Sequence, residues 1–278
     1  MSTNQQRREA AKRKLERQLS RRAERAKRRR IIGVVATVVA VLVVAGGIWF
    51  LTTVGDSDDT TTPAASETST PAEAKNSGGP CAYTETPQEP AAKPVGLPAD
   101  PAQTPNTGTV NLAVKTDQGD IGLVLDRAKA PCTVQSVEHL AKAKFFDATK
   151  CHRLTASAGL KVLQCGDPTG TGTGGPGYTV KDEFPTDLAV ATEPQGASVY
   201  PRGVLAMANT GQPNSGGSQF FLVYGDSKLP PQYTVFGTID AAGLATLDKI
   251  AAGGITPGNS PEDGEPKLPV NIQTATVA

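Results

Sequence analysis

Residues 31–54 form an unbroken stretch without a charged side chain, and this stretch divides the chain into parts that fold under different constraints. A helix of this length reaches about 36 Å at ~1.5 Å per residue, enough to cross a hydrocarbon core of about 30 Å. A helix also satisfies every backbone polar group of a single segment in lipid. We therefore expect a transmembrane helix over 31–54. A cleaved signal peptide is the alternative, but its apolar region would be shorter and no small-x-small cleavage pattern follows.

Charge is distributed unevenly on the two sides of this stretch. Residues 1–30 hold thirteen Lys or Arg and three Glu, a net charge of +10, although the whole chain has a net charge of only +1. Basic residues before a transmembrane helix keep that end in the cytoplasm. The sequence thus predicts a single-pass protein of the cell membrane, with a basic cytoplasmic arm that contacts anionic lipid and a larger extracytoplasmic part. No nucleic-acid partner is expected, because no aromatic side chains interleave the charges.

Residues 55–107 are rich in Pro, Thr, Ser, Ala and acidic side chains. Such a segment has too little apolar surface to offset the conformational entropy lost on folding. We expect a disordered extracytoplasmic linker. Its second half contains a cysteine and more evenly spaced prolines, which leaves open that part of it lies against the folded domain.

All four cysteines follow the predicted membrane segment. An even number of cysteines in an oxidising compartment favours disulfides, although four cysteines allow three pairings and buried free thiols remain the alternative. The pair Cys151 and Cys165 is favoured, because these residues fall in two predicted strands joined by one hairpin. No metal site and no cofactor are expected, since the chain has no C-x-x-C pattern and its two histidines lack ligand spacing. The other two cysteines are Cys81 and Cys132.

Strand patterns dominate from residue 108 onward. Two alternating apolar runs, 109–116 and 119–126, are separated by a short turn and predict a β-hairpin. Helical spacing of apolar residues follows from Pro131, and a second short helix is expected over 241–251. Many short strands with two helices favour a closed antiparallel barrel capped by helices. Further strands are predicted within 150–154, 160–167, 202–210, 219–224 and 233–239.

The stretch NSGGSQFFLVYG, residues 214–225, places a glutamine at the start of one of these strands. Side chains alternate along a strand, so Gln219, Phe221 and Val223 are expected to share one face. A polar amide beside an aromatic ring can line a cleft that offers both hydrogen bonds and an apolar wall. A solvent-facing strand residue is the simpler alternative.

Seven motifs resemble those of the cyclophilins, the cyclophilin-type peptidyl-prolyl isomerases, in the order and at nearly the spacing of that family. The resemblance covers residues 108–278 and is closest to a membrane-anchored bacterial form. It implies an all-β domain with a closed eight-stranded antiparallel barrel, a helix at each end, and proline-containing polypeptides as substrates. The motifs are VKTDQGDIGLVL, APCTVQSVEHL, CHRL, QCGDPTGTGTGG, VLAMAN, SGGSQFF and YTVFG.

The resemblance also implies a site. Arg153 matches the catalytic arginine, with Gln164 on the neighbouring strand and Asn209 beside the substrate backbone as further catalytic residues. Two departures concern the pocket: Lys161 and Val162 stand where the family usually has Phe and Met, and Lys228 replaces an aromatic residue, which implies weaker binding of cyclosporin. The residues implied to bind substrate are Val162, Ala208, Gln219, Phe221, Leu229 and Tyr233.

The predicted chemistry needs no bond to be made or broken. Rotation about a peptide bond faces a barrier of about 18 to 20 kcal/mol because resonance must be lost, and the twisted amide regains a nitrogen lone pair. A permanently charged guanidinium aimed at this nitrogen, here that of Arg153, stabilises the transition state selectively. The alternative is a catalytically weak module that binds proline-containing segments of a partner protein.

Overall fold

The computed structural model describes residues 74–278 of the chain. The expected basic arm (1–30), transmembrane helix (31–54) and first part of the linker (55–73) lie outside the described residues. Within residues 74–278, no helix has the length and apolar character needed to cross a membrane.

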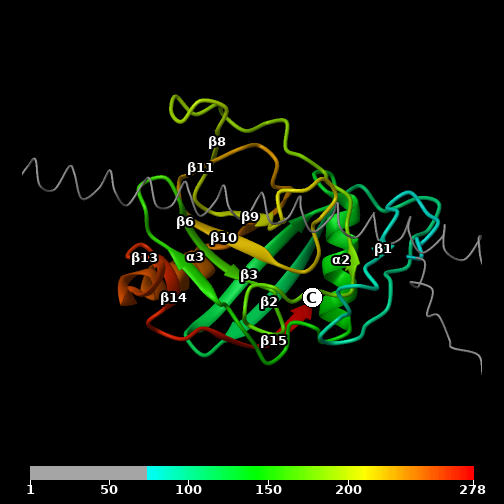
Figure 1. The fold of residues 1–278 in the computed structure, drawn as a ribbon, viewed down its shortest axis with the longest axis horizontal. Helices are drawn as coiled ribbons and strands as arrows, with labels where there is room; N and C mark the ends of the chain where they lie inside the picture. The colour runs from blue at the N-terminus through cyan, green and yellow to red at the C-terminus, as the bar shows by residue number, and fades with distance from the viewer. Residues whose placement is uncertain (1–73) are drawn as a thin grey trace, which may run out of the picture. The chain divides into compact units, whose positions relative to one another are not determined.

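A curled antiparallel sheet of eleven strands forms the domain (Figure 1). The hairpin expected from the alternating runs is present, as β2 (Thr109–Thr116) and β3 (Gly119–Asp126). The remaining strands of this sheet are β4 (Thr149–Lys150), β5 (Arg153–Thr155), β6 (Lys161–Cys165), β9 (Val204–Met207), β10 (Phe220–Gly225), β12 (Val235–Ile239), β13 (Ile255–Ser260), β14 (Asp263–Pro266) and β15 (Asn271–Val277).

The sheet does not close into the eight-stranded barrel that the sequence predicts. Its hydrogen-bonded order is β13-β14-β5-β6-β10-β9-β12-β3-β2-β15-β4, which leaves β13 and β4 as the two edges. The predicted strand over 150–154 is interrupted at Cys151 and His152, so β4 pairs with β15 whereas β5 pairs with β6 and β14. The expectation of closure was therefore wrong: the hairpin β13–β14 occupies the side of β5 that a closing strand would need.

Two helices lie at opposite ends of the curled sheet, α2 (Pro131–Lys142) and α3 (Ala241–Gly253) (Figure 1). Helix α2 begins with a proline, which lacks the N–H that would be unsatisfied at this position. The carboxylate of Glu183 accepts hydrogen bonds from the next two backbone N–H groups, those of Cys132 and Thr133, at 3.0 and 2.9 Å. Helix α3 is capped by Asp240, whose side chain accepts from the Gly243 N–H.

The two faces of the sheet bury separate apolar clusters. The inner cluster contains Leu163, Phe220 and Leu222 and extends to α2 and α3. The smaller cluster on the outer face contains Val162, Phe221 and further residues of β9 and β12. Adjacent residues of one strand thus enter different clusters, as the alternation in the sequence predicts. Two short two-stranded sheets accompany the main sheet: β1 (Thr84–Glu85) with β7 (Tyr178–Thr179), and β8 (Ser198–Tyr200) with β11 (Ser227–Leu229).

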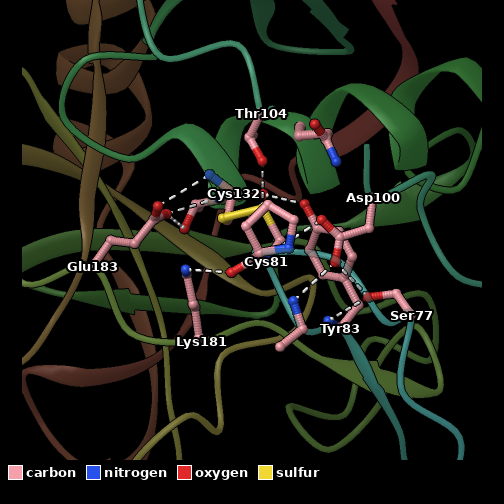
Figure 2. Close-up of a disulfide and its surroundings, with 12 residues drawn as sticks. Ser77, Cys81, Tyr83, Asp100, Thr104, Cys132, Lys181 and Glu183 are labelled. Atoms are coloured by element: carbon pink, nitrogen blue, oxygen red, sulfur yellow. Dashed lines mark hydrogen bonds between the residues drawn. A yellow bond between two sulfur atoms is a disulfide. The ribbon is translucent and has the colours of Figure 1, made fainter. Parts of the chain in front are cut away.

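Residues 74–107, which we call the N-terminal strap, pack against the domain although they fall within the expected linker. A disulfide joins Cys81 to Cys132 at the start of α2, and both Cys81 and Tyr83 are fully buried (Figure 2). The Asp100 carboxylate accepts hydrogen bonds from the N–H groups of Cys81 and Ala82. The compact unit therefore begins well before residue 108.

The second disulfide joins Cys151 to Cys165, the pair that the sequence favours. Cys151 lies in the interruption between β4 and β5, and Cys165 is the last residue of β6. The bond therefore links the break between β4 and β5 to the neighbouring strand β6. With both disulfides formed, no described cysteine is free.

Candidate functional site

A row of five residues crosses the outer face of the sheet and changes from charged to apolar along its length. Arg153 of β5 pairs with Gln164 of β6, which pairs with Phe221 of β10. Phe221 in turn pairs with Ala206 of β9, and Ala206 pairs with Val235 of β12. Directly paired residues project to the same face of a sheet. The strand register therefore places the guanidinium group and the apolar cluster on one surface, separated by a single amide.

Hydrogen bonds fix the side chains at the polar end of this row. The Arg153 guanidinium donates from Nη1 to Gln164 Oε1 at 3.2 Å, and Gln164 Nε2 donates to Gln219 Oε1 at 2.9 Å. Gln219 Nε2 then donates to the carbonyls of Gly172 and Gly174, both at 3.0 Å. The chain of amides connects the arginine to the glycine-rich loop over residues 170–177.

Asp263 is a member of this site that the sequence analysis did not identify. Its carboxylate accepts two hydrogen bonds from Arg153, from Nε and from Nη2, each at 2.8 Å. This bidentate pairing fixes the plane of the guanidinium. Asp263 is 110 residues from Arg153 in sequence and reaches it only because β14 pairs with β5. The local sequence around Asp263 reads only as an acidic turn, and it gives no indication that this segment pairs with β5.

The ion pair changes the ionisation of both partners. The hydrogen bond to Asp263 is the main cause that raises the pKa of Arg153, although partial burial opposes it. The same hydrogen bond lowers the pKa of the Asp263 carboxyl group. Both groups are therefore charged across the physiological range. Three of the five guanidinium N–H groups are used by Asp263 and Gln164, so two remain available to a ligand.

We expect Asp263→Asn to lower kcat of the activity proposed below by about fivefold to tenfold, with little change in KM. The amide removes the charge and one acceptor, so the guanidinium is held less firmly while the apolar pocket is unaffected. The cost in stability should stay below about 1 kcal/mol, because the two side chains are 37% and 22% exposed. Steady-state kinetics and thermal unfolding check both expectations.

The matched control is Glu265→Gln. Glu265 lies on β14, like Asp263, and the substitution removes its ion pair with Lys150. Its kcat should equal that of the wild type. Asp263→Asn should also have no further effect when Arg153 is already alanine. An equal loss in both backgrounds would contradict a role that acts through the arginine.

The apolar end of the row is a cluster of apolar side chains that contains three aromatic rings. Phe221 packs edge-to-face with Tyr233, their ring centroids 5.5 Å apart, and lies 6.4 Å from the Tyr200 ring. The Tyr200 hydroxyl donates to the Tyr233 carbonyl at 3.1 Å and accepts from the Tyr233 N–H at 3.2 Å, which fixes the segment that carries the ring. Val162 is buried in the same cluster, and Leu229 and Ala208 pack on its border. Tyr200 and Val235 belong to the same cluster.

Asn209 follows Ala208 in the segment directly after β9. Its side-chain amide donates to the Gln232 carbonyl at 2.8 Å, and its Oδ1 accepts from the Gly211 N–H at 3.0 Å. These bonds shape the local loop. The nine residues expected to bind or act on substrate thus lie on one face, with a fixed cation at one end and the apolar cluster around Phe221 at the other. No group of residues able to hold a metal ion occurs in the described part of the chain.

The part of the chain that carries this site is similar in sequence to known proteins. The family model described as "Cyclophilin type peptidyl-prolyl cis-trans isomerase/CLD" matches residues 110–277. A "Probable peptidyl-prolyl cis-trans isomerase B" of Mycobacterium tuberculosis is 54% identical over 205 residues, which cover 71% of this chain and 63% of the relative. The protein of the same name from Mycobacterium leprae is 55% identical over 186 residues, covering 66% and 62%.

A "Peptidyl-prolyl cis-trans isomerase" of Helicobacter pylori is 42% identical over 149 residues, which cover 53% of this chain and 83% of that protein. The match to the mycobacterial relatives therefore spans less than two thirds of their length but more of this chain than the Helicobacter match does.

Proposed function

Because the chain belongs to the cyclophilin-type peptidyl-prolyl cis-trans isomerase family, we propose that it catalyses rotation about X-Pro peptide bonds in polypeptides. The observation that carries the proposal is the row from Arg153 through Gln164 to Phe221. It sets a charged donor beside an apolar, aromatic cluster on one surface. A proline ring bound against Phe221 leaves its imide nitrogen on the side of the guanidinium.

The proposed mechanism is stabilisation of the twisted amide. In the planar ground state the prolyl nitrogen has no free lone pair, so the free N–H groups of Arg153 gain little from it. As the bond twists the lone pair returns, and a hydrogen bond from a fixed cation becomes stronger in the transition state than in either isomer. Gln164 and Asp263 hold the guanidinium in place beforehand, so that little reorganisation is needed as the bond rotates.

The apolar residues supply binding and orientation. Phe221, Val162 and Leu229 hold the proline ring by contact, and Tyr233 closes the border of the pocket. Asn209 and Gln219 flank the path of the substrate backbone and are proposed to bind its carbonyl groups. A fixed ring and a fixed backbone confine the motion to the X-Pro bond.

We further propose that the enzyme acts on proteins outside the cytoplasmic membrane and assists their folding. The support is the uncharged segment 31–54 preceded by basic residues. Two disulfides add to it, because disulfides persist in oxidising compartments and are rare in the cytosol. Contact of the basic arm with anionic lipid belongs to the same proposal.

The test is the cis-to-trans rate of a proline-containing tetrapeptide with the full chain held in detergent micelles. Uncatalysed exchange takes tens of seconds to minutes, which leaves a wide window for acceleration. We expect the first-order rate to rise in proportion to enzyme concentration. A rate that does not depend on the enzyme would overturn the proposed activity.

A second candidate function is a module that binds proline-containing segments with little turnover. The observation that favours it is that the Gln219 and Asn209 amides already donate to loop carbonyls. The binding of a substrate carbonyl then requires one of these bonds to break. Peptide affinity without acceleration of exchange would support this candidate over catalysis.

A further inference from the structure

The N-terminal strap lies outside the part of the chain that matches the family model, which begins at residue 110. It is nevertheless fixed to the domain at several points (Figure 2). The Tyr83 hydroxyl donates to the Cys132 carbonyl at 2.8 Å, beside the Cys81–Cys132 disulfide, and the Lys181 ammonium group donates to the Pro80 carbonyl at 2.6 Å. The strap is therefore a structural addition to the family's domain.

The sequence match to the mycobacterial relative extends over most of this addition. Its match covers 71% of the 278 residues, about 197 residues. A contiguous match of that length has to begin at or before residue 82, wherever it ends. Most of the strap thus lies within the matched region, beyond the limits of the family model.

The strap meets the glycine-rich loop next to the candidate site. Strand β1 pairs with β7, and the Thr86 N–H donates to the Gly177 carbonyl at 2.9 Å. Gly177 has φ +80°, and a Cβ atom there would lie 2.9 Å from the Ala91 nitrogen. The strap backbone therefore approaches the loop more closely than a residue with a side chain would allow.

A groove of about 640 Å³ runs between the strap and the candidate site. Its lining includes strap residues as well as Gln164, Ala208, Asn209 and Gln219, which belong to the candidate site. Phe221 itself does not line the groove, but Gln164, its partner on the neighbouring strand, does. A polypeptide with its proline against Phe221 can thus enter the groove past Gln164. The strap residues that line it are Thr86, Glu89, Pro90 and Ala92.

The groove is formed before any ligand binds, because buried contacts fix the loop that makes its floor. The fully buried Asp167 carboxylate accepts from the N–H groups of Thr169, Thr171 and Gly172 at 2.7, 3.1 and 2.6 Å. Burial alone would raise the pKa of Asp167, but hydrogen bonds from the Thr169 hydroxyl and from backbone N–H groups of the loop lower it below its ordinary value. The loop is thus held by a charged acceptor.

Glu89 is the one charged side chain among the residues that line the groove. It is exposed, and it takes part in no ion pair within residues 74–278. Its backbone is fixed, since the Glu89 N–H donates to the Thr86 carbonyl and the Thr86 hydroxyl donates to the Glu89 carbonyl. The groove therefore presents a negative charge at a defined place on an otherwise uncharged surface.

We propose that the strap forms part of the substrate-binding surface and that Glu89 selects polypeptides with a Lys or Arg close to the X-Pro bond. This inference rests on the proposed function, because it takes the ligand to be the same chain whose proline occupies the Phe221 pocket. A carboxylate in a partly solvated groove attracts a cation and repels an anion. We expect a Lys-containing peptide to bind about threefold to tenfold more tightly than its Glu-containing counterpart.

The test uses peptides that differ at one residue, with Lys, Gln or Glu placed two or three residues before the proline or two residues after it. Nuclear magnetic resonance titration of the full chain in neutral detergent micelles gives the affinity, and exchange spectra of the same samples give the rate of isomerisation. For the wild type we expect the Lys preference at one or more of these positions, and its decrease at high salt. Glu89→Gln should remove the preference, and Glu89→Lys should reverse it.

Glu193→Gln is the matched control, because Glu193 is an exposed glutamate that does not line the groove. This variant changes the net charge by the same amount and should keep the wild-type preference. An equal Lys-to-Glu affinity ratio in the wild type and in Glu89→Gln at every position would overturn the inference, and so would peptides that do not bind. A Lys-to-Glu affinity ratio that changes with the residue at position 89, in samples where exchange is not accelerated, would support the role of Glu89 in binding. It would overturn only the proposed catalysis.

Discussion

Arg153→Ala is expected to lower kcat/KM for a proline tetrapeptide by about a hundredfold or more. Removal of a preorganised donor that acts on the transition state typically costs two to three orders of magnitude. Arg153 is the proposed donor, and Gln164 and Asp263 hold its guanidinium on the surface that carries Phe221. The loss should appear in kcat, because the apolar pocket that binds the ring is left intact.

Arg153→Lys is the informative control for this prediction. Lysine keeps the positive charge but not the rigid fork that Asp263 and Gln164 hold. We expect it to recover only a small part of the lost activity. Full activity of the alanine variant, with the pocket unchanged, would contradict the assignment of Arg153, and full activity of the lysine variant would show that charge alone suffices.

The largest expected effect on stability follows from removal of the Cys81–Cys132 disulfide. The bond closes a loop with a sequence separation of 51 residues, and loop-closure entropy for that length corresponds to about 4 kcal/mol. Replacement of both cysteines by alanine should lower the free energy of unfolding by about 3 to 4 kcal/mol. Urea denaturation of the oxidised wild type and the double variant measures the difference.

The matched comparison is the double alanine variant of Cys151 and Cys165, whose bond spans only 14 residues. Loop entropy alone gives about 3 kcal/mol for that length, a smaller loss.

The Cys81–Cys132 variant should also lose the Lys preference of the groove, because the strap is no longer tied to α2. An unchanged free energy of unfolding would show that the contacts of Tyr83 and Lys181 hold the strap adequately without the covalent bond.

Local patterns were sufficient to predict the elements whose apolar spacing is regular. The hairpin of β2 and β3 has strictly alternating side chains, and α2 has a helical repeat with a proline at its start. Alternation over 219–223 also separated Phe221 from Phe220, which lie in different clusters. Such patterns depend only on neighbours in sequence, so they can be read without knowledge of the fold.

Features that depend on long-range pairing were not predictable in this way. Asp263 belongs to the site because the hairpin β13–β14 pairs with β5, and the same pairing leaves the sheet open. The strap has the composition of a linker, yet buried Tyr83 and a disulfide hold it to the domain, and hydrogen bonds to Asp100 order its own backbone. Family resemblance supplied the roles expected of Arg153 and Gln164, and it contained no information on residues outside the family's domain.

The central claim is that this surface lowers the barrier to rotation rather than only binding proline. Exchange spectroscopy on a peptide with resolved cis and trans prolyl resonances tests it most directly, because binding and rotation are observed in one sample of the full chain. We predict that a small fraction of wild-type protein gives exchange cross-peaks within a second, whereas the free peptide gives none on that timescale. Resonances that shift on binding while cis and trans populations still fail to exchange would contradict the account.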